Sequence, residues 1–169
     1  MSGSASSLEQ LSERIGETLL VSDWLSISQE EVDAFGRLTR DPDPMHMDPD
    51  WARNHGPFGE TVLYGFLTLS LLPALAKGLR FRHGEHEPGY DVNYGFNRIR
   101  FVSPVPVGRR FRDHVVLKAV ERRPDGGLLV TTEHTIEVEY GDRPALVAEW
   151  LGLLVRHPAA PPAGKDSLP

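Results

Sequence analysis

Two side chains capable of acid–base chemistry stand five residues apart in a proline-rich segment. The segment Thr39–Asp48 contains Asp41 and His46, with Pro42 and Pro44 between them. An imidazole can accept a proton near neutral pH, and a carboxylate can orient a water molecule or the ring. Because prolines stiffen the backbone, we expect a rigid loop in which both side chains share one water. The alternative is that Asp41 caps a turn and His46 is a surface residue.

A second candidate feature is Gly65, which opens an apolar stretch after Leu63 and Tyr64. A helix that starts here presents unpaired backbone N–H groups and a partial positive charge. Glycine lets a carbonyl oxygen approach the backbone closely, so the site could hold the oxygen of a thioester as negative charge develops. The alternative is that Gly65 only avoids a clash where the chain enters the helix.

A short helix is expected before the acid–base segment. Ser28 and Glu31 have the spacing of a capping box, which predicts a helix start. The helix should end before Pro42, since residues that precede proline avoid the helical region. Its expected apolar face consists of Val32, Phe35 and Leu38.

A second helix is expected from Gly65 to Lys77, with Gly78 as its C-terminal stop. Apolar residues lie all round this stretch, which is typical of a buried helix. Pro73 should bend it or leave a carbonyl unpaired.

The second half of the chain predicts long antiparallel strands. From Leu128 onward, apolar and polar residues alternate, so one face of this strand should be buried. That face comprises Leu128, Val130, Thr132, His134, Ile136, Val138 and Tyr140. Other expected strands are Thr18–Val21, Asn97–Phe101, Arg112–Val120 and Ala145–Val155, with hairpin turns at Pro124–Gly127 and Gly141–Asp142. A sheet curled around the apolar helix would satisfy both burial demands, which indicates an α+β fold.

Together these segments resemble the MaoC-like dehydratases, the (R)-specific enoyl-CoA hydratases of the hot-dog fold. The resemblance rests on Phe35–His46 and Tyr64–Leu71, while Val92–Phe101 and Pro104–Gly108 are similar to the NodN-like branch. It covers residues 20–155 and implies a curved antiparallel sheet wrapped around a long central buried helix. It also implies a homodimer in which two sheets join edge to edge.

The resemblance implies site residues as well. The Asp and His of the family motif match Asp41 and His46, and its helix-start glycine matches Gly65. By resemblance, Asp41 and His46 hold the water that adds to C3 of a trans-2-enoyl thioester, and one of them handles the proton at C2. The Gly65 amide polarises the thioester carbonyl. The implied substrate is an acyl-CoA or acyl-carrier-protein thioester.

Three positions depart from the family pattern. Arg40 stands where the family usually has glycine, Asp43 where it has an amide residue, and Tyr64 where it has histidine. Asp43 places a second carboxylate near Asp41, which would raise one of the two pKa values if both groups were buried and ionised. Arg40 could neutralise the added charge.

Composition narrows the function classes. The 169 residues fit one domain, expected at residues 8–156 between a flexible N-terminus (1–7) and a Pro/Ala-rich tail (157–169). The net charge of −6 does not indicate the general positive charge that nucleic-acid binding favours. The absence of cysteine excludes disulfides, thiolate catalysis and Cys-ligated metals. With no signal peptide or membrane-spanning run in the sequence, we expect a cytoplasmic enzyme without metal or redox cofactor.

Three other interpretations stay open. Hard cations favour oxygen-rich sites, so the acid–base segment could bind a metal. Hot-dog thioesterases use an acidic residue on or near the central helix, but Gly65–Lys77 contains none. The domain could also bind an acyl ligand without catalysis. The candidate metal ligands are Asp41, Asp43, His46 and Asp48.

Two further histidines, His114 and His134, lie in predicted strands. We interpret them as core or surface histidines rather than as ligands. The three tryptophans, Trp24, Trp51 and Trp150, are too scattered in the sequence to indicate an aromatic binding platform.

Overall fold

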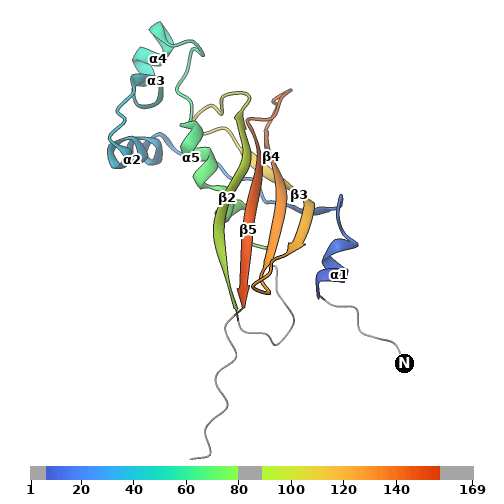
Figure 1. Ribbon diagram of the computed structural model, residues 1–169. Helices are drawn as coiled ribbons and strands as arrows, with labels where there is room; N and C mark the ends of the chain where they lie inside the picture. Colours follow the sequence, from blue (N-terminus) through green and yellow to red (C-terminus); the bar gives the residue numbers. More distant parts are fainter. Residues whose placement is uncertain (1–6, 80–88, 157–169) are drawn as a thin grey trace, which may run out of the picture.

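A curved antiparallel sheet forms the body of the molecule. The structure is a computed structural model that describes residues 7–79 and 89–156, so the predicted flexible ends lie almost wholly outside the described residues. Within the described residues, one sheet has the strand order β1-β3-β4-β5-β2, and every neighbouring pair is antiparallel (Figure 1). The strands are β1 (Thr18–Val21), β2 (Gly89–Phe101), β3 (Phe111–Arg122), β4 (Leu128–Val138) and β5 (Leu146–Arg156).

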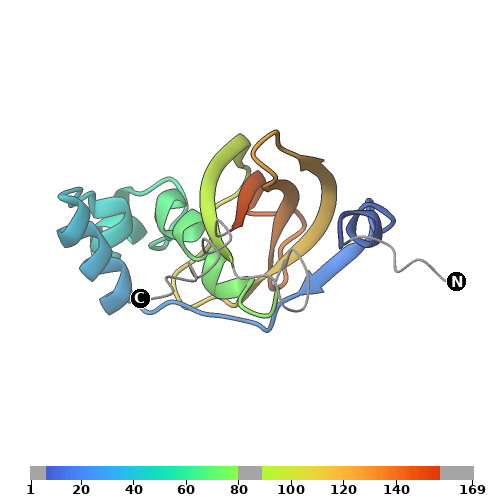
Figure 2. The same cartoon turned by 60° about the horizontal axis from the view of Figure 1, so that its bottom comes forward.

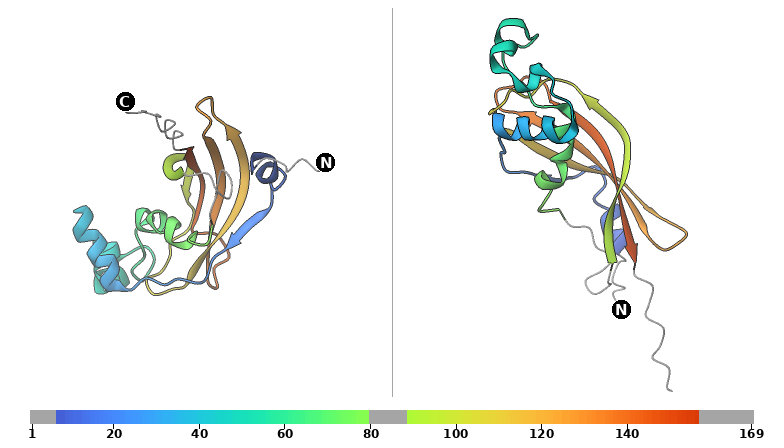
Figure 3. Two further views of the ribbon diagram at one scale, coloured as in Figure 1. Left: turned by 90° about the horizontal axis from the view of Figure 1, so that it is seen from below. Right: turned by 90° about the vertical axis from the view of Figure 1, so that its left-hand side faces the viewer.

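The helices occupy two places around the sheet. Figures 2 and 3 show α5 and α6 against its concave side, while α2, α3 and α4 form a lobe beside it. This curved sheet around a helical segment is the predicted α+β arrangement. No helix within the described ranges is both long and apolar enough to cross a membrane. The helices are α1 (Ser7–Ser12), α2 (Gln29–Thr39), α3 (Pro44–Met47), α4 (Pro49–His55), α5 (Gly65–Ser70) and α6 (Leu72–Leu75).

The strand alternation predicted from the sequence is confirmed along β4. Every second residue from Leu128 to Val138 is buried on the concave face. Tyr140 does not continue this face, contrary to the prediction. Its φ of 60° ends the strand, and its side chain is 90 % exposed. The turn into β5 follows at once, with the Gly141 N–H donating to the Val138 carbonyl.

The predicted single helix from Gly65 to Lys77 is divided at Leu71 into α5 and α6. Pro73 has no N–H to donate to the preceding turn, so it lies in the first turn of α6, where none is needed. The second segment ends at Leu75, earlier than the predicted stop at Gly78. Nor is the helix buried all round, since Phe66 is 68 % exposed.

The capping box before α2 is confirmed. The Ser28 hydroxyl accepts from the Glu31 N–H, and the Glu31 carboxylate accepts from the Ser28 N–H at 2.8 Å. The helix buries Val32, with Phe35 partly covered, as predicted. The prediction that Leu38 lies on the same buried face is wrong. Leu38 is 81 % exposed, since α2 lies in the lobe beside the sheet rather than against its concave side.

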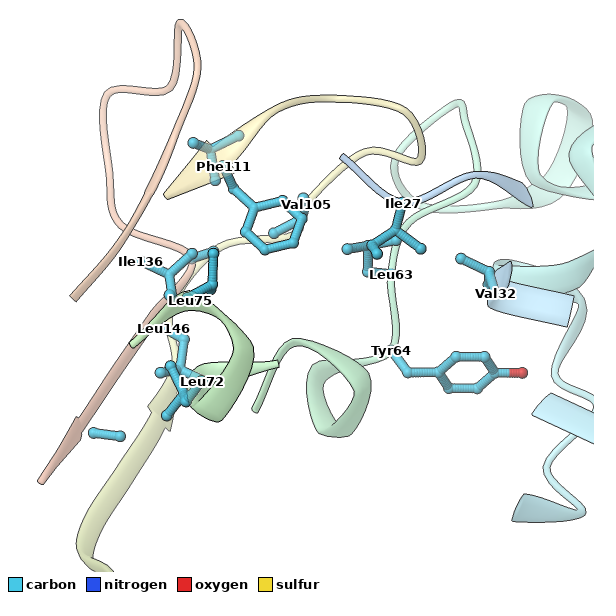
Figure 4. Close-up of a cluster of buried hydrophobic side chains, with 13 residues drawn as sticks. Ile27, Val32, Leu63, Tyr64, Leu72, Leu75, Val105, Phe111, Ile136 and Leu146 are labelled. Carbon is cyan, nitrogen blue, oxygen red and sulfur yellow. The ribbon is translucent and has the colours of Figure 1, made fainter. Parts of the chain in front are cut away.

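The main core lies between the sheet and α5–α6 and extends toward α2 (Figure 4). Phe111, Leu72, Ile136 and Leu146 are all fully buried in it. At roughly 25 cal/mol for each Å² of apolar surface removed from water, such side chains supply most of the stabilising energy. The core therefore holds α5, and with it Gly65, at a set place on the sheet.

The two edges of the sheet differ. β1 is a four-residue strand, whereas β2 has 13 residues and pairs only with β5 among the described strands. Most of β2 is exposed, including Tyr90, Tyr94 and Phe96. A long edge strand with unpaired backbone groups and exposed aromatic rings is a template for pairing with another chain.

Candidate active site

The segment that carries His46 is helical rather than a loop. Asp43 and Asp48 each precede a proline, and each caps the helix that follows. The Asp43 carboxylate accepts from the Met45 N–H at 2.8 Å, and the Asp48 carboxylate from the Trp51 N–H at 2.9 Å. The sequence contained this signal, because Asp followed by Pro is typical of a helix start. His46 consequently projects from α3, a short helix fixed at its first turn.

One nitrogen of His46 is held by the backbone. The ring Nδ1 lies 2.7 Å from the Val62 carbonyl oxygen, and a carbonyl can only accept, so Nδ1 carries the proton. Within the described residues, Nε2 has no hydrogen-bond partner. In the neutral ring this nitrogen is the acceptor, which is the state a general base requires.

Gln29 ties together three segments around His46. Its side-chain amide donates to the His46 carbonyl at 2.7 Å and accepts from the Thr61 hydroxyl at 2.7 Å. The first residue of α2 is thus bonded both to α3 and to the strand-like segment that leads to α5. Sequence reasoning missed this residue, because nothing in a lone Gln at a helix start indicates a contact across 17 residues.

Tyr64, one of the three residues that depart from the family pattern, packs directly on His46. It is 4 % exposed, and its ring centroid lies 3.9 Å from that of His46. Its hydroxyl donates to the Asp41 carbonyl at 2.6 Å. Burial first, and then the negative charges of Asp41 and Asp43, raise the pKa of Tyr64 above its ordinary value. The phenol therefore stays protonated and keeps its donor role at neutral pH.

Gly36 makes room for this arrangement. A Cβ built at Gly36 would overlap the Tyr64 hydroxyl and the Met47 sulfur. Because α2 carries no side chain there, Tyr64 can reach past it to the Asp41 carbonyl. The glycine and the tyrosine together set the position of the segment that follows α2.

His46 and Gly65 border one hollow of about 440 Å³. Phe101 and Thr68 also line it, so β2 and α5 form part of its wall. A Cβ at Gly65 would come within 2.9 Å of the Phe101 ring, so glycine is required for close packing here. The Gly65 N–H opens α5, and no hydrogen bond joins it to another described residue. Both interpretations of Gly65, packing and an available amide, are compatible with this geometry.

Asp41 is placed differently from the other two candidate residues. Its side chain is exposed and does not line the hollow, and its carboxylate forms no hydrogen bond with His46 in the described part of the chain. Its backbone carbonyl is held by Tyr64, which is itself stacked on His46. The structure thus brings His46 and Gly65 together and leaves Asp41 outside the lining of the hollow.

The suggested metal ligands are engaged elsewhere. The carboxylates of Asp43 and Asp48 accept backbone N–H groups as helix caps. Between residues 7 and 79 and between 89 and 156, no group of three or more His, Asp or Glu side chains is placed to hold a metal ion. Asp43 is thereby explained as a cap rather than as a second carboxylate of the site.

Arg40 ends α2 in a left-handed conformation, with φ 60° and ψ 34°. This region is strained for residues with a Cβ and is open to glycine. The conformation explains in physical terms why glycine suits this position in the family pattern. In this chain, Arg40 adopts this strained conformation directly before Asp41.

Known proteins resemble this chain in sequence over most of its length. Residues 10–138 match the family described as MaoC like domain. The chain is 39 % identical to nodulation protein N of Rhizobium leguminosarum bv. viciae, over 94 % of this chain and 97 % of that protein. It is 41 % identical to 3-hydroxyacyl-thioester dehydratase Z of Mycobacterium tuberculosis, over 85 % of this chain and 92 % of that protein.

Solved structures agree on the fold. A MaoC-like dehydratase from Rhodospirillum rubrum is similar with a TM-score of 0.65 and 20 % identity, over 85 % of this chain and 94 % of that chain. An (R)-hydratase from A. caviae involved in PHA biosynthesis is similar with a TM-score of 0.58 and 24 % identity, over 80 % and 97 %. The predicted hot-dog fold is confirmed by these similarities.

Proposed function

Because the chain belongs to the MaoC-like domain family, we propose that it catalyses the reversible hydration of a trans-2-enoyl thioester to a 3-hydroxyacyl thioester. The observation that carries this proposal is the hollow shared by His46 and Gly65. One ring nitrogen of His46 is fixed by the Val62 carbonyl, and the other is unoccupied by any described residue. A base and a backbone amide that face one space are what addition of water to a polarised enoyl group requires.

The proposed chemistry is a balanced addition. His46 Nε2 accepts a proton from water as the oxygen bonds to C3, and the C2=C3 electron pair moves toward the thioester carbonyl. The Gly65 N–H stabilises the negative charge that develops on that oxygen. The proton taken up by His46 is then delivered to C2, directly or through Asp41, which completes the 3-hydroxyacyl product and restores the neutral ring. The reverse sequence removes water.

Asp41 is proposed to complete the water site, although its side chain does not line the hollow. Tyr64 fixes the Asp41 backbone carbonyl through a hydrogen bond of 2.6 Å, and the proposed role requires the carboxylate to turn toward water bound at His46. The carboxylate then orients the water or moves the second proton.

We also propose that the working unit is a homodimer formed through β2. β2 forms this edge of the sheet with 13 residues, and the side chains of Tyr94 and Phe96 lie exposed along it. Phe101, in the same strand, packs on Gly65 and is 48 % exposed. A second copy at this edge would cover the aromatic rings and close the hollow from one side.

The direct test is hydration of crotonyl-CoA and of trans-2-octenoyl-CoA, followed by loss of the enoyl absorbance. Light scattering on the same preparation should give twice the mass of one chain. His46→Gln and Asp41→Asn should each lower kcat by about a hundredfold or more, since positioned acid–base groups supply roughly 10²–10⁴ in rate. His55→Gln, on the exposed end of α4, is the matched control and should retain the rate.

Two outcomes would overturn parts of this proposal. Undiminished turnover in both site variants would reject the assigned roles while leaving the reaction in place. Folded wild-type protein that hydrates neither substrate would reject the reaction, and the chain would then be an acyl-binding protein rather than a hydratase.

A further inference from the structure

The helix that carries His46 is too short to fix its own position. α3 has four residues, of which Pro44 is exposed and the other three are half-buried. Met47 packs only partly against the core. Because helix nucleation is costly, a single turn is marginal without support from other segments. The place of the His46 ring therefore depends on the bonds that reach α3 from elsewhere in the chain.

The oxygen that holds the His46 ring belongs to a well-anchored segment. Residues 61–63 pair with residues 105–107 through two backbone hydrogen bonds, of 2.8 and 3.0 Å. Val62, in the middle of this segment, is 3 % exposed, and its carbonyl accepts from the His46 Nδ1–H at 2.7 Å. The ring keeps this bond only while α3 lies at a set distance from residues 61–63.

The side-chain amide of Gln29 spans that distance. Its Nε2 donates to the His46 carbonyl at 2.7 Å and to the Asp33 carboxylate at 2.8 Å. Its Oε1 accepts from the Thr61 hydroxyl at 2.7 Å. Because a carbonyl and a carboxylate can only accept, the amide has one possible orientation, and both of its N–H groups are used. Thr61 is 7 % exposed, so its hydroxyl has little access to water as another partner.

These bonds form a closed loop around His46. One path runs from the His46 carbonyl through Gln29 to Thr61, and the other runs from the His46 ring to Val62, the next residue. The loop holds the backbone and the ring of one residue, so it restricts the side-chain torsions that would turn the ring. Without the Gln29 amide, the ring bond alone would tie α3 to residues 61–63, among the hydrogen bonds of the described residues.

The ring bond also decides which nitrogen of His46 can act as a base. With the proton on Nδ1, Nε2 keeps its lone pair, and His46 lines the hollow that contains Gly65. A neutral imidazole without this bond can place its proton on either nitrogen. In the tautomer with the proton on Nε2, that nitrogen cannot accept a proton from water.

We propose that Gln29 is a positioning residue for the reaction and that, together with Thr61, it holds the His46 ring in the Nδ1–H tautomer. The inference rests on the proposed hydration of enoyl thioesters, because it takes His46 as the base. Gln29 does not line the hollow, so it acts through His46 rather than on the substrate. Small displacements of a catalytic group are costly in rate, so loss of the loop should lower turnover.

The first test reads the ring directly and needs no turnover. Nitrogen NMR of protein labelled at its histidines gives the share of each tautomer at a pH where the ring is neutral, and the His46→Gln spectrum assigns the signal. In the wild type, Nδ1 should carry the proton. In Gln29→Leu, the nitrogen shifts should move toward those of a mixture of both tautomers. A Gln29 that served only to stabilise α2 would leave these shifts unchanged.

The second test measures hydration of crotonyl-CoA. Gln29→Leu and Thr61→Val each break the loop with little change in shape, and each should lower kcat about ten- to hundredfold while KM stays nearly constant. Thr61→Ser keeps the hydroxyl that donates to Gln29 and should retain most of the rate. Gln10→Leu, at an exposed position of α1, is the matched control and should behave as the wild type in both tests.

The two variants of the loop also test each other. Because Gln29 and Thr61 act through one path, the double variant should lose little more rate than Gln29→Leu alone. Urea denaturation shows which variants are folded, and Thr61→Val carries both tests if Gln29→Leu does not fold. Two losses of rate that multiply in the double variant would overturn the shared path.

The outcomes separate this inference from the proposed function. An unchanged tautomer share in folded Gln29→Leu overturns the inference, whatever happens to the rate. A changed tautomer share with an unchanged kcat also overturns it, and the reaction would then stand with another base. If the wild type hydrates neither crotonyl-CoA nor trans-2-octenoyl-CoA, but Gln29→Leu loses the Nδ1–H tautomer, the positioning of His46 is supported and the reaction is rejected.

Discussion

Two histidines of this chain bind an oxygen atom through the same ring nitrogen but differ in the surroundings of the other nitrogen. His46 and His134 each use Nδ1 in a short hydrogen bond, at 2.7 Å to a carbonyl and 2.6 Å to a carboxylate. His46 lies on a four-residue helix in the lateral lobe, and its Nε2 borders an open hollow. His134 lies in the middle of β4, and its Nε2 is taken up by Thr132.

The difference shows how surroundings assign a role to one residue type. A neutral partner at Nδ1, and a second nitrogen that no residue of the described ranges occupies, leave His46 able to exchange a proton with a ligand. The buried Asp113 carboxylate and the Thr132 hydroxyl occupy both ring nitrogens of His134. His134 therefore links β3 to β4 and lines a cavity between the sheet and α6. The first histidine is expected to matter for rate and the second for stability.

The largest expected effects come from changing each histidine in turn. His134→Gln leaves the Asp113 carboxylate buried without its partner, which should cost about 3–5 kcal/mol of unfolding free energy. His46→Gln should cost about 1 kcal/mol, because only one hydrogen bond to the uncharged Val62 carbonyl is lost. Urea denaturation of both variants gives the comparison. Equal destabilisation would contradict the assignment of separate roles.

Tyr64→Phe should give a smaller effect confined to the site. The variant keeps the ring against His46 and loses the hydrogen bond to the Asp41 carbonyl, so stability should fall by about 1 kcal/mol. If Tyr64 positions Asp41, kcat should fall about tenfold while KM changes little. Tyr140→Phe, at a 90 % exposed position, serves as the control. A change in KM alone would show that Tyr64 contacts substrate instead.

The smallest expected effect concerns the strained end of α2. Arg40→Gly removes a side chain from a left-handed residue and should stabilise the protein by roughly 0.5–1 kcal/mol. Arg37→Gly, three residues earlier in the regular helix, removes the same charge and should destabilise it by about 1 kcal/mol. Thermal unfolding of the pair measures the difference. Two changes of the same sign would show that charge, rather than backbone conformation, governs this turn.

Much of the sheet could be predicted from local pattern. The alternation from Leu128 to Val138 and the capping box at Ser28 depend on neighbours within a few residues, and both are confirmed. Leu38 and Phe66 are exposed because burial depends on which face meets the sheet, and periodicity alone does not state that. The break at Leu71 follows from Pro73, a signal that predicted a bend but not its exact place.

The site was less predictable than the fold. A motif points to Asp41, His46 and Gly65, but it does not show that Asp41 lies outside the lining of the hollow, nor that Tyr64 and Gln29 reach Asp41 and His46 from other segments. The pairing of His134 with Asp113 spans 21 residues and exists only in one strand register. The spacing of Asp113 and His134 in the sequence does not reveal that register.

The exposed edge of β2 has a consequence for how this protein responds to dilution. If a second copy covers Tyr94 and Phe96, part of the folding free energy comes from association, and measured stability then depends on protein concentration. At low concentration the freed strand would be open to pairing with any extended chain. The same backbone that joins two correct copies is then the place where aggregation begins.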